Sequence, residues 1–343
     1  MQQLWLRFVQ FYLTIGFKFY YKKFEAVYLD EIPKDKAVIY LSNHQNALLD
    51  PLLITLKSTR KNYFLTKAAV FKNPIAAKIL HSLQMLPVYR IRDGVNTVQK
   101  NFKIFTTCAN LLHKKESLLL FPEGGHNLNR KVRPLKKGVS RILEETFKKY
   151  PETEIVIIPI GVNYQNPKEY GDSMSVFFGN HISPNQFWNG DSIDFIDLAK
   201  AISAEMKKLT THIESISEYD NTLKKLRELQ VDFTNPVEVN KCLNTNFNYT
   251  GKKVKKDAIL YPFFKQLVKI FYFAPYFIWN KVAFPKIKED EYIATFRFAL
   301  LLSITPIYLL LGVLICCLTF GKTIGLAFLL TGILLPLITL RVK

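Results

Sequence analysis

The sequence predicts an α/β protein in which helices cover a mixed sheet, followed by a helical accessory segment and a two-helix transmembrane hairpin. Three observations favour this prediction. Short apolar runs alternate with segments of helical period up to about residue 182, two long uncharged runs lie near the C-terminus, and the chain is strongly basic. The predicted parts are an N-terminal helix (1–24), an α/β domain (25–190), an accessory segment with a linker (191–295) and the hairpin (296–343).

The N-terminal segment Leu4–Phe24 mixes Trp, Phe and Tyr with basic residues. Charges interrupt it too often for a membrane span, and it lacks the small-residue cleavage site of a signal peptide. It is either an interfacial helix with its aromatic rings at the acyl boundary or an ordinary amphipathic core helix. A second aromatic and basic stretch, Tyr261–Phe284, repeats this character and is expected to lie on the membrane as well.

The α/β domain is expected to contain six strands with four helices between them. The predicted strands are Ala37–Leu41, Asn62–Thr66, Met85–Tyr89, Ser117–Phe121, Glu154–Ile160 and Ser175–Phe178. The predicted helices are Leu48–Leu56, Pro74–Leu83, Val95–Leu112 and Lys136–Lys149. Beyond this domain, the charged segment 194–229 has a helical period, and the Asn-, Thr- and Lys-rich segment 235–256 reads as a linker.

The C-terminal hairpin is predicted from two uncharged runs, Phe298–Phe320 and Thr323–Leu340, joined at Gly321-Lys322. The first run is long enough to cross a bilayer. A buried helical hairpin in a soluble core is the alternative. Basic residues flank both outer ends, so the positive-inside rule places these ends and the catalytic body on the cytoplasmic face of the membrane.

The composition indicates an anionic partner, because 47 Lys and Arg against 28 Asp and Glu give a net charge of +19. High aromatic content, with 27 Phe and 17 Tyr, suits a membrane surface and membrane lipids. A nucleic-acid binder would explain the charge but not the hairpin. The four cysteines show no zinc-ligand or disulfide pattern, which indicates a reducing compartment and no metal. The oligomeric state stays open.

A candidate catalytic pair lies in Ser42–Pro51 (SNHQNALLDP), directly after a predicted strand. His44 would then occupy a strand-to-helix loop, where catalytic groups gather in α/β folds. A histidine with a nearby carboxylate, here Asp50, forms a general-base pair, because the carboxylate fixes the tautomer and stabilises the imidazolium. A purely structural pair is the alternative.

Candidate substrate-binding residues follow two other predicted strands. Leu118–His126 runs into a Pro-Glu-Gly-Gly turn, where Glu123, Gly124 and Gly125 would let a ligand approach the backbone. A basic cluster comes next and suits a phosphate, although it is also typical of a solvated face. The cluster consists of Arg130, Lys131, Arg133, Lys136 and Lys137. The segment Pro87–Gly94 adds Arg90 and Arg92 at a strand end, and Ile158–Tyr164 reads as a core strand.

In this order the four segments resemble the glycerophospholipid acyltransferase family, which contains glycerol-3-phosphate and lysophosphatidate acyltransferases. That family carries Asn-His followed by Asp, an aromatic-x-x-Arg block, Phe-Pro-Glu-Gly and a Val/Ile-Pro-Ile/Val-Gly block, all present between about residues 37 and 164. The resemblance implies that His44 is the general base and Asp50 its orienting partner. It also implies that Arg92 binds phosphate and that Glu123 and Gly124 help to seat the acceptor.

The sequence departs from the common family pattern in two places. Five residues separate His44 from Asp50 instead of four, which resembles the fungal glycerol-phosphate and dihydroxyacetone-phosphate acyltransferases. Those also carry Glu-Gly-Gly and Pro-Leu-Lys-x-Gly, here Pro134–Gly138. His126 stands after the glycines where the family has Thr/Ser-Arg, so Arg130 or Arg133 is expected to replace that phosphate ligand.

The resemblance implies a membrane-bound O-acyltransferase of phospholipid biosynthesis. It would transfer a fatty acyl group from acyl-CoA or acyl-carrier protein to a hydroxyl of lysophosphatidate or glycerol 3-phosphate, without a cofactor or metal. Acylation of another lysolipid or lyso-aminolipid is the alternative within the enzyme class. A non-catalytic, lipid-binding membrane scaffold is the alternative outside it.

Overall fold

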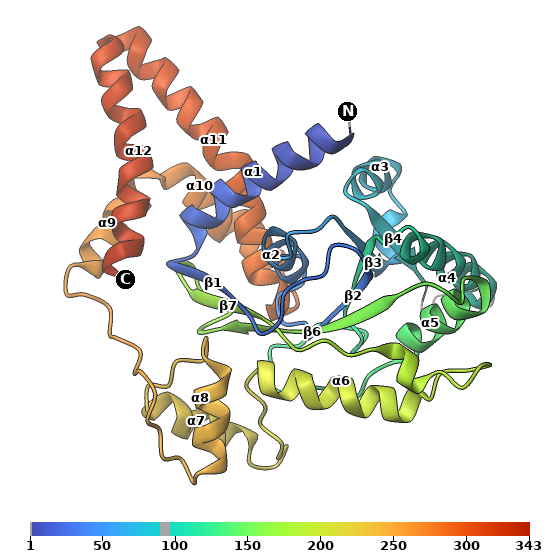
Figure 1. Cartoon of the computed structure of the whole chain (residues 1–343). Helices are drawn as coiled ribbons and strands as arrows, with labels where there is room; N and C mark the ends of the chain where they lie inside the picture. The colour runs from blue at the N-terminus through green and yellow to red at the C-terminus, as the bar shows by residue number, and fades with distance from the viewer. Residues whose placement is uncertain (1, 90–96) are drawn as a thin grey trace.

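The computed structural model describes residues 2–89 and 97–343, and a seven-stranded sheet forms its centre (Figure 1). The strand order is β1-β7-β6-β2-β5-β3-β4. Only β6 and β7 are antiparallel neighbours, so the sheet is mixed, as predicted. The strands are β1 (Lys23–Tyr28), β2 (Ala37–Ser42), β3 (Asn62–Lys67), β4 (Met85–Val88), β5 (Ser117–Leu120), β6 (Ile155–Tyr164) and β7 (Ser173–Phe178).

Helices cover both faces of the sheet. One face packs against α1 (Gln2–Tyr20), α2 (Leu49–Lys57) and the start of α11 (Ile293–Phe320). The other face packs against α4 (Thr97–His113), α5 (Gly138–Lys149) and α6 (Phe195–Leu209), with α6 below the sheet in Figure 1. The remaining α-helices are α3 (Pro74–Ser82), α7 (Tyr219–Glu228), α8 (Pro236–Asn244), α9 (Tyr261–Phe271), α10 (Phe273–Phe277) and α12 (Lys322–Val342).

The central strand β2 is buried along its whole length, which explains its continuous apolar sequence AVIYLS. Its parallel neighbours β5 and β6 end near the same edge of the sheet. The loops that follow these strands therefore meet at one place, and they carry the polar residues singled out in the sequence.

The boundary of the α/β domain lies further along the chain than residue 190. Leu198, Ile202 and Met206 of α6 are buried in the core on one face of the sheet, so this helix belongs to the domain. The expected linker 235–256 also differs, because α8 forms within it. Asn235 caps α8 through its side chain, and Val239 and Cys242 pack in a small separate core with α7.

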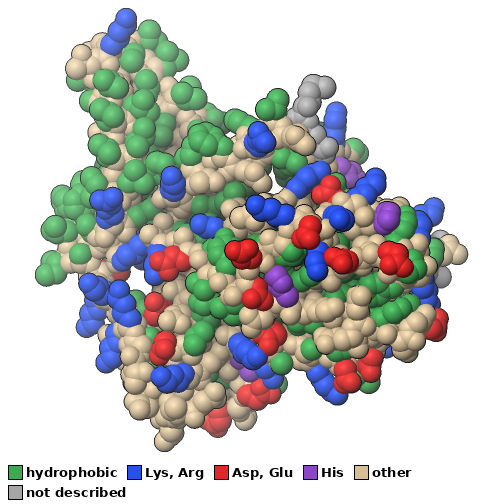
Figure 2. Space-filling view, viewed as in Figure 1, with side chains coloured by type: hydrophobic (Ala, Val, Ile, Leu, Met, Phe, Trp, Pro, Cys, Tyr) green, Lys and Arg blue, Asp and Glu red, His purple; other side chains and the backbone are tan. Residues whose placement is uncertain are grey.

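The C-terminal hairpin is present and projects away from the sheet (Figure 1). At 1.5 Å per residue, the 28 residues of α11 and 21 residues of α12 span about 42 and about 32 Å, enough for a hydrocarbon layer of about 30 Å. Large apolar side chains such as Leu310 and Leu318 are 70% and 78% exposed. Figure 2 shows hydrophobic side chains covering the hairpin and basic ones gathered near its base. A soluble core would bury such side chains, so the structure argues against the soluble-core alternative.

Helix α1 has features of both predicted alternatives, a core helix and an interfacial helix. Its C-terminal end is core: Phe17 stacks on Phe298 of α11 with ring centroids 4.3 Å apart, and Tyr20 is fully buried. Its N-terminal half leaves Leu4, Phe8 and other apolar side chains exposed. The exposed half has the character of an interfacial helix, and the buried half fixes it against the sheet.

Tyrosine hydroxyls donate hydrogen bonds to three backbone carbonyls that lie four residues before prolines around the hairpin. A proline has no N–H, so the carbonyl four residues before it loses its helical hydrogen bond. Pro306 and Pro336 leave such carbonyls at Leu302 and Gly332, and Phe271, four residues before Pro275, carries the last carbonyl of α9. Each of these carbonyls accepts a hydrogen bond from a tyrosine hydroxyl of another element. The donors are Tyr308 for Phe271 (2.6 Å), Tyr12 for Leu302, and Tyr272 for Gly332 (2.6 Å). These bonds tie α1, α9, α10, α11 and α12 together.

Candidate active site

The loop between β2 and α2 brings the predicted catalytic pair together. Nδ1 of His44 lies 2.8 Å from Oδ2 of Asp50, which occupies the first turn of α2. The spacing of five residues therefore permits the contact. Ala47, inside this loop, has a φ of 31°, an uncommon conformation for a non-glycine residue of the kind that occurs at active sites.

The Asp50 carboxylate is fully buried and satisfied on both oxygens. The backbone N–H groups of Gln45 and Asn46 donate to Oδ2 at 2.7 and 2.8 Å, and the Tyr164 hydroxyl donates to Oδ1 at 2.6 Å. Burial and the charge of Asp50 raise the pKa of Tyr164 well above its usual value, so its hydroxyl stays protonated as a donor. These bonds stabilise the charged carboxylate and fix its orientation toward His44.

The imidazole of His44 is held by two ring contacts, and the neighbouring Asn43 fixes the backbone before it. Asp50 binds Nδ1, and the ring stacks on Phe121 with centroids 3.9 Å apart. The preceding residue, Asn43, pairs with the backbone of β6: its Oδ1 accepts from Val162 N at 2.7 Å and its Nδ2 donates to Val162 O at 3.0 Å. Among the described residues Nε2 of His44 has no hydrogen-bond partner, so this nitrogen is available to take a proton.

Glu123 forms a second polar cluster at the same edge of the sheet. Its buried carboxylate receives the Arg133 side chain, with Nε at 2.8 Å and the terminal nitrogen at 2.6 Å from Oε2. Burial raises the pKa of Glu123, and the Arg133 charge opposes that shift. The Arg133 side chain also donates to the carbonyl of Gly125. Gly124 has a φ of 77°, a conformation that favours glycine in this turn. Arg133 thus shapes the turn that carries the predicted acceptor-seating residues.

Arg130 has a structural position, which corrects its assignment as a phosphate ligand. Its side chain is buried, donates to the carbonyls of Tyr164 (2.8 Å) and Gln165 (3.1 Å), and stacks 3.6 Å from the Phe233 ring centroid. Burial lowers the pKa of Arg130 to about 10. The Arg130 guanidinium therefore fixes the backbone at the end of β6, next to Tyr164. We assign Arg130 to the scaffold of the site.

Two other predicted substrate-binding residues, Arg90 and the phosphate ligand Arg92, lie outside the described residues, and their assignment stays a prediction. Lys136 from the same basic cluster is exposed and has no ion pair among residues 2–89 and 97–343. An added Cβ on Gly124 would lie 3.3 Å from Cγ of Lys136. Lys136 is therefore a cation available beside the glycine turn.

No sequence pattern predicts that the start of α11 contributes to the site. Thr295 Oγ1 accepts from the backbone N–H of Leu48 at 3.2 Å, and Arg297 donates to the carbonyl of Lys168 at 2.9 Å. Asn46 of the catalytic loop donates to the carbonyl of Pro167 at 2.9 Å. The base of α11 and the loop between β6 and β7 (165–172) therefore both hold the loop that carries His44.

His126 connects this segment to the candidate base. Its ring centroid lies 5.6 Å from that of His44, and its Nε2 lies 3.2 Å from Oε2 of Glu289. Ligand atoms of His126, Glu289 and Glu291 lie within 4.8 Å of one another, a spacing that permits a shared cation. Glu289 is exposed, and hydrogen bonding and ring packing account for the position of His126 without an ion.

The geometry is that of a histidine–carboxylate base at the end of a buried strand, facing a Glu-Gly-Gly turn. Residues 23–163 match the family model described as Acyltransferase. Both the catalytic loop and the Glu123 turn lie inside the matched region.

Two curated relatives and one solved structure illustrate the similarity. A chloroplastic 1-acyl-sn-glycerol-3-phosphate acyltransferase of Brassica napus is 28% identical over 121 residues, 34% of this chain and 33% of that protein. Glycerol-3-phosphate O-acyltransferase 1 of Saccharomyces cerevisiae is 27% identical over 106 residues, 31% of this chain and 12% of that protein. The 1-acyl-sn-glycerophosphate acyltransferase structure from Thermotoga maritima is 20% identical, covers 53% of this chain and 69% of that one, and has a TM-score of 0.38. The chain thus spans a third or less of these two curated relatives.

Proposed function

We propose that this chain is a membrane-bound glycerolipid acyltransferase that acylates a hydroxyl of lysophosphatidate or glycerol 3-phosphate. The observation that carries the proposal is the His44–Asp50 pair, in which Nδ1 is held at 2.8 Å and Nε2 is free among the described residues. The names of the two curated relatives support these two acceptors. Acyl-CoA or acyl-carrier protein is the proposed donor.

The proposed reaction is a direct transfer. Nε2 of His44 takes the proton of the acceptor hydroxyl while the hydroxyl oxygen attacks the thioester carbonyl. Asp50 stabilises the imidazolium through Nδ1–H, and Tyr164 and two backbone N–H groups fix that carboxylate by hydrogen bonds. Collapse of the tetrahedral intermediate breaks the C–S bond, and the departing thiolate receives the proton from His44. The acyl group ends on the acceptor oxygen.

The acceptor phosphate would bind beside the Glu-Gly-Gly turn. Arg92, from the sequence resemblance, and Lys136, from its position next to Gly124, are the proposed ligands. Arg133 supports the turn through Glu123 and Gly125. Fixed cations at this point would hold the phosphate so that a nearby hydroxyl reaches His44.

The hairpin is the proposed membrane anchor, with the catalytic body on the cytoplasmic face. Both apolar helices are long enough to cross a bilayer by length and composition. Their outer ends lie on the side of the catalytic body, since Lys343 contacts Glu169 while Thr295 contacts Leu48. Basic residues at this base favour the cytoplasmic side.

An acyl-transfer assay on the purified full-length chain tests the proposal. Labelled acyl-CoA and acyl-carrier protein would be offered with lysophosphatidate, glycerol 3-phosphate and phosphate-free lysolipids. His44→Ala should lower turnover by roughly two to four orders of magnitude, because it removes the general base. His113→Ala is a matched control, because His113 is exposed and stacks on Tyr150 at the far end of α4. Near wild-type turnover of His44→Ala, or no transfer to any acceptor by the wild type, would refute the proposal.

A further inference from the structure

A large cavity lies between the hairpin and the catalytic body, apart from the candidate active site. Its volume is about 1080 Å³, and its walls come from α1, α9, α10, α11, α12 and the 168–170 loop. His44, Asp50 and Glu123 do not line it. Ligand pockets of this volume usually bury most of a drug-sized molecule, so the space is sufficient for a lipid chain.

The cavity is built from fixed walls. Pro306 and Pro336 both line it, and the carbonyls that they free accept the hydroxyls of Tyr12 and Tyr272. An unpaired carbonyl in an apolar environment is costly, so these bonds favour one arrangement of α1 and α9 around the hairpin. The helices are therefore held around the space by specific contacts at the two prolines.

One part of the cavity is apolar. Its lining includes Ile15 of α1, Leu301 and Leu309 of α11 and Ile333 of α12. Two of these elements are the apolar helices proposed to span the bilayer. A ligand that enters from the membrane would therefore meet a surface suited to a hydrocarbon chain.

Another part of the lining is basic. Five cationic side chains outnumber the two acidic ones, Glu169 and Asp257. Three cations already have partners, since Lys168 pairs with Asp290, Lys343 pairs with Glu169, and Arg297 donates to the Lys168 carbonyl. The other two are Lys265 and Lys269.

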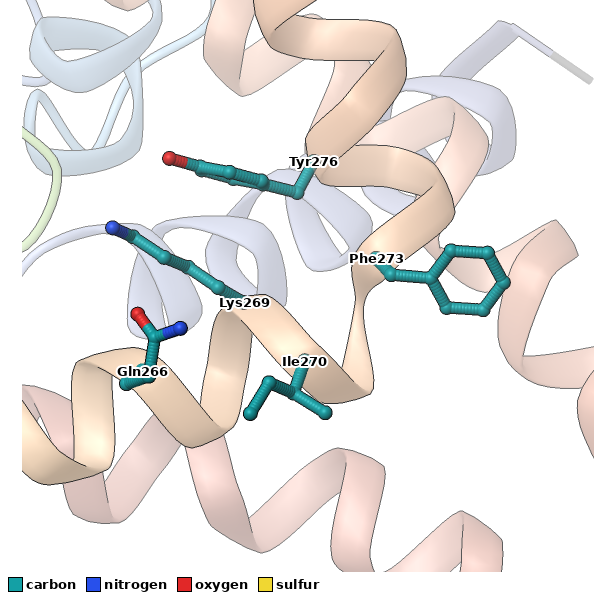
Figure 3. Close-up of a pocket in the computed structure, with 5 residues that line it drawn as sticks. All are labelled: Gln266, Lys269, Ile270, Phe273 and Tyr276. Carbon is teal, nitrogen blue, oxygen red and sulfur yellow. The ribbon is translucent and has the colours of Figure 1, made fainter.

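Lys265 and Lys269 lie one turn apart on α9, and neither has a carboxylate partner among the described residues. Each ammonium lies over a tyrosine ring, 5.6 Å from that of Tyr261 and 5.4 Å from that of Tyr276. Figure 3 shows Lys269 and Tyr276 pointing to the same side, while Phe273 points away. Lys269, Phe273 and Tyr276 also line a smaller hollow of about 580 Å³ with Gln266 and Ile270. Two unpaired ammonium groups on one helix face suit a phosphate.

We propose that this cavity binds one anionic diacyl phospholipid of the bilayer, which remains there and does not react. A hydrocarbon chain would lie against α1, α11 and α12, and the phosphate would contact Lys265 and Lys269. The 168–170 loop, which forms part of the wall, continues from Pro167, the partner of Asn46 in the catalytic loop. The lipid would therefore support the base of the hairpin from behind the catalytic loop. This binding does not depend on the proposed reaction.

Native mass spectrometry of the delipidated full-length protein tests the proposal. The probes are phosphatidylglycerol, phosphatidylcholine of the same chains, and lysophosphatidate. We expect one phosphatidylglycerol to bind at least about tenfold more tightly than phosphatidylcholine, because charge-assisted bonds contribute more than neutral ones. Lys265→Gln with Lys269→Gln should remove this preference. Lys252→Gln with Lys256→Gln is the matched control, because these exposed residues have the same spacing and charge but lie outside the cavity.

A second variant tests the apolar part without changing charge. Thr305→Trp places a large ring in the cavity and should weaken binding of both diacyl lipids. Equal binding of the two diacyl lipids, or a preference that survives loss of both lysines, would overturn the proposal and indicate non-specific lipid contact only. Competitive displacement of phosphatidylglycerol by lysophosphatidate would overturn the resident-lipid assignment and make the cavity an acceptor site. If the double variant fails to fold, the single Lys269→Gln variant provides the same comparison.

Discussion

Asp172 is a buried carboxyl group behind the catalytic loop. It is 4% exposed, its Oδ1 accepts from Asn166 N at 2.9 Å, and its Oδ2 has no partner among the described residues. Burial raises the pKa of Asp172 to about 7, against the smaller lowering effects of two backbone hydrogen bonds and of Lys343 and Arg130. The folded protein therefore holds a proton on Asp172 over a range where the unfolded chain has already lost it.

The stability contributed at Asp172 should fall as pH rises from about 4 to about 7, because only the folded state is protonated there. Three pKa units correspond to about 4 kcal/mol as an upper bound. Asp172→Asn should raise the thermal midpoint at pH 8 by several degrees and change it little at pH 4. Differential scanning fluorimetry across this range measures both, with Asp220→Asn on the exposed face of α7 as control. Identical shifts at the two pH values would contradict the assignment.

Arg92 provides a residue-level test of the acceptor. If it binds the acceptor phosphate, Arg92→Ala should raise the apparent KM for a phosphate-bearing acceptor by one or two orders of magnitude, as loss of a charge-assisted contact implies. The KM for the acyl donor should change little. Arg92→Lys should restore binding only in part, because lysine offers a point charge in place of a planar fork. Steady-state kinetics with phosphate-bearing and phosphate-free acceptors checks this, and equal losses on both would exclude the phosphate role.

The polar partners of the site show how far residue patterns reach. His44 and Asp50 could be predicted together because a short loop connects them and a general base needs both. Tyr164 could not be paired with Asp50, since they lie 114 positions apart and the apolar run before Tyr164 reads as a plain core strand. The burial of Arg130 could not be predicted either. In the sequence Arg130 belongs to a basic cluster of the kind that faces solvent, and only the packing shows that the Phe233 ring covers its guanidinium.

Among the helices and strands, those with continuous apolar runs could be predicted from the sequence, and the more polar ones could not. Continuous apolar runs predicted β2, β5 and β6, because central parallel strands are buried on both faces. Strand β1 was missed because it lies at the sheet edge and alternates charged and apolar residues. Helix α8 was missed because its sequence is polar, and its Asn235 cap and Pro236 start were the local signals that mark it.

Gly161 shows that a motif residue can serve packing between elements. A Cβ at this position would lie 1.9 Å from the carbonyl oxygen of Leu209 at the end of α6. Asn163 donates to the same oxygen at 2.9 Å. The glycine of the Pro-Ile-Gly block therefore allows α6 to approach β6 closely, and it does not contact the candidate base.

The tyrosine–carbonyl bonds make a prediction about the elements that they join. Tyr272→Phe removes the donor to the Gly332 carbonyl and should lower stability by about 1–2 kcal/mol, since that carbonyl then lacks a partner next to Pro336. Tyr276→Phe is the control on the same turn, because no hydrogen bond of its hydroxyl is found among the described residues. Urea or thermal unfolding in detergent compares the two. A smaller effect for Tyr272→Phe than for Tyr276→Phe would argue against the compensation.

In the whole molecule the C-terminal hairpin and the loop that carries His44 share contacts. Thr295 and Arg297 lie at the start of α11, and they hold Leu48 and Lys168 beside the candidate base. At the C-terminal end of α12, the Val342 carbonyl accepts a hydrogen bond from Ala258 N at 2.9 Å, and Lys343 forms an ion pair with Glu169. Both outer ends of the hairpin are thus fixed to one side of the catalytic body, which the uncharged runs alone did not specify.

This arrangement predicts the topology. A reporter at the Gly321–Lys322 turn should lie across the membrane from the catalytic body, because a single span separates them in each direction along the chain, about 42 Å in α11 and about 32 Å in α12. A variant with its four native cysteines replaced would carry one new cysteine, either by Lys322→Cys or by Lys252→Cys in the exposed linker. In sealed vesicles, an impermeant thiol reagent should label only one of the two, and detergent should expose both. Labelling of both sites from the same side would show that the apolar helices lie on the membrane instead of crossing it.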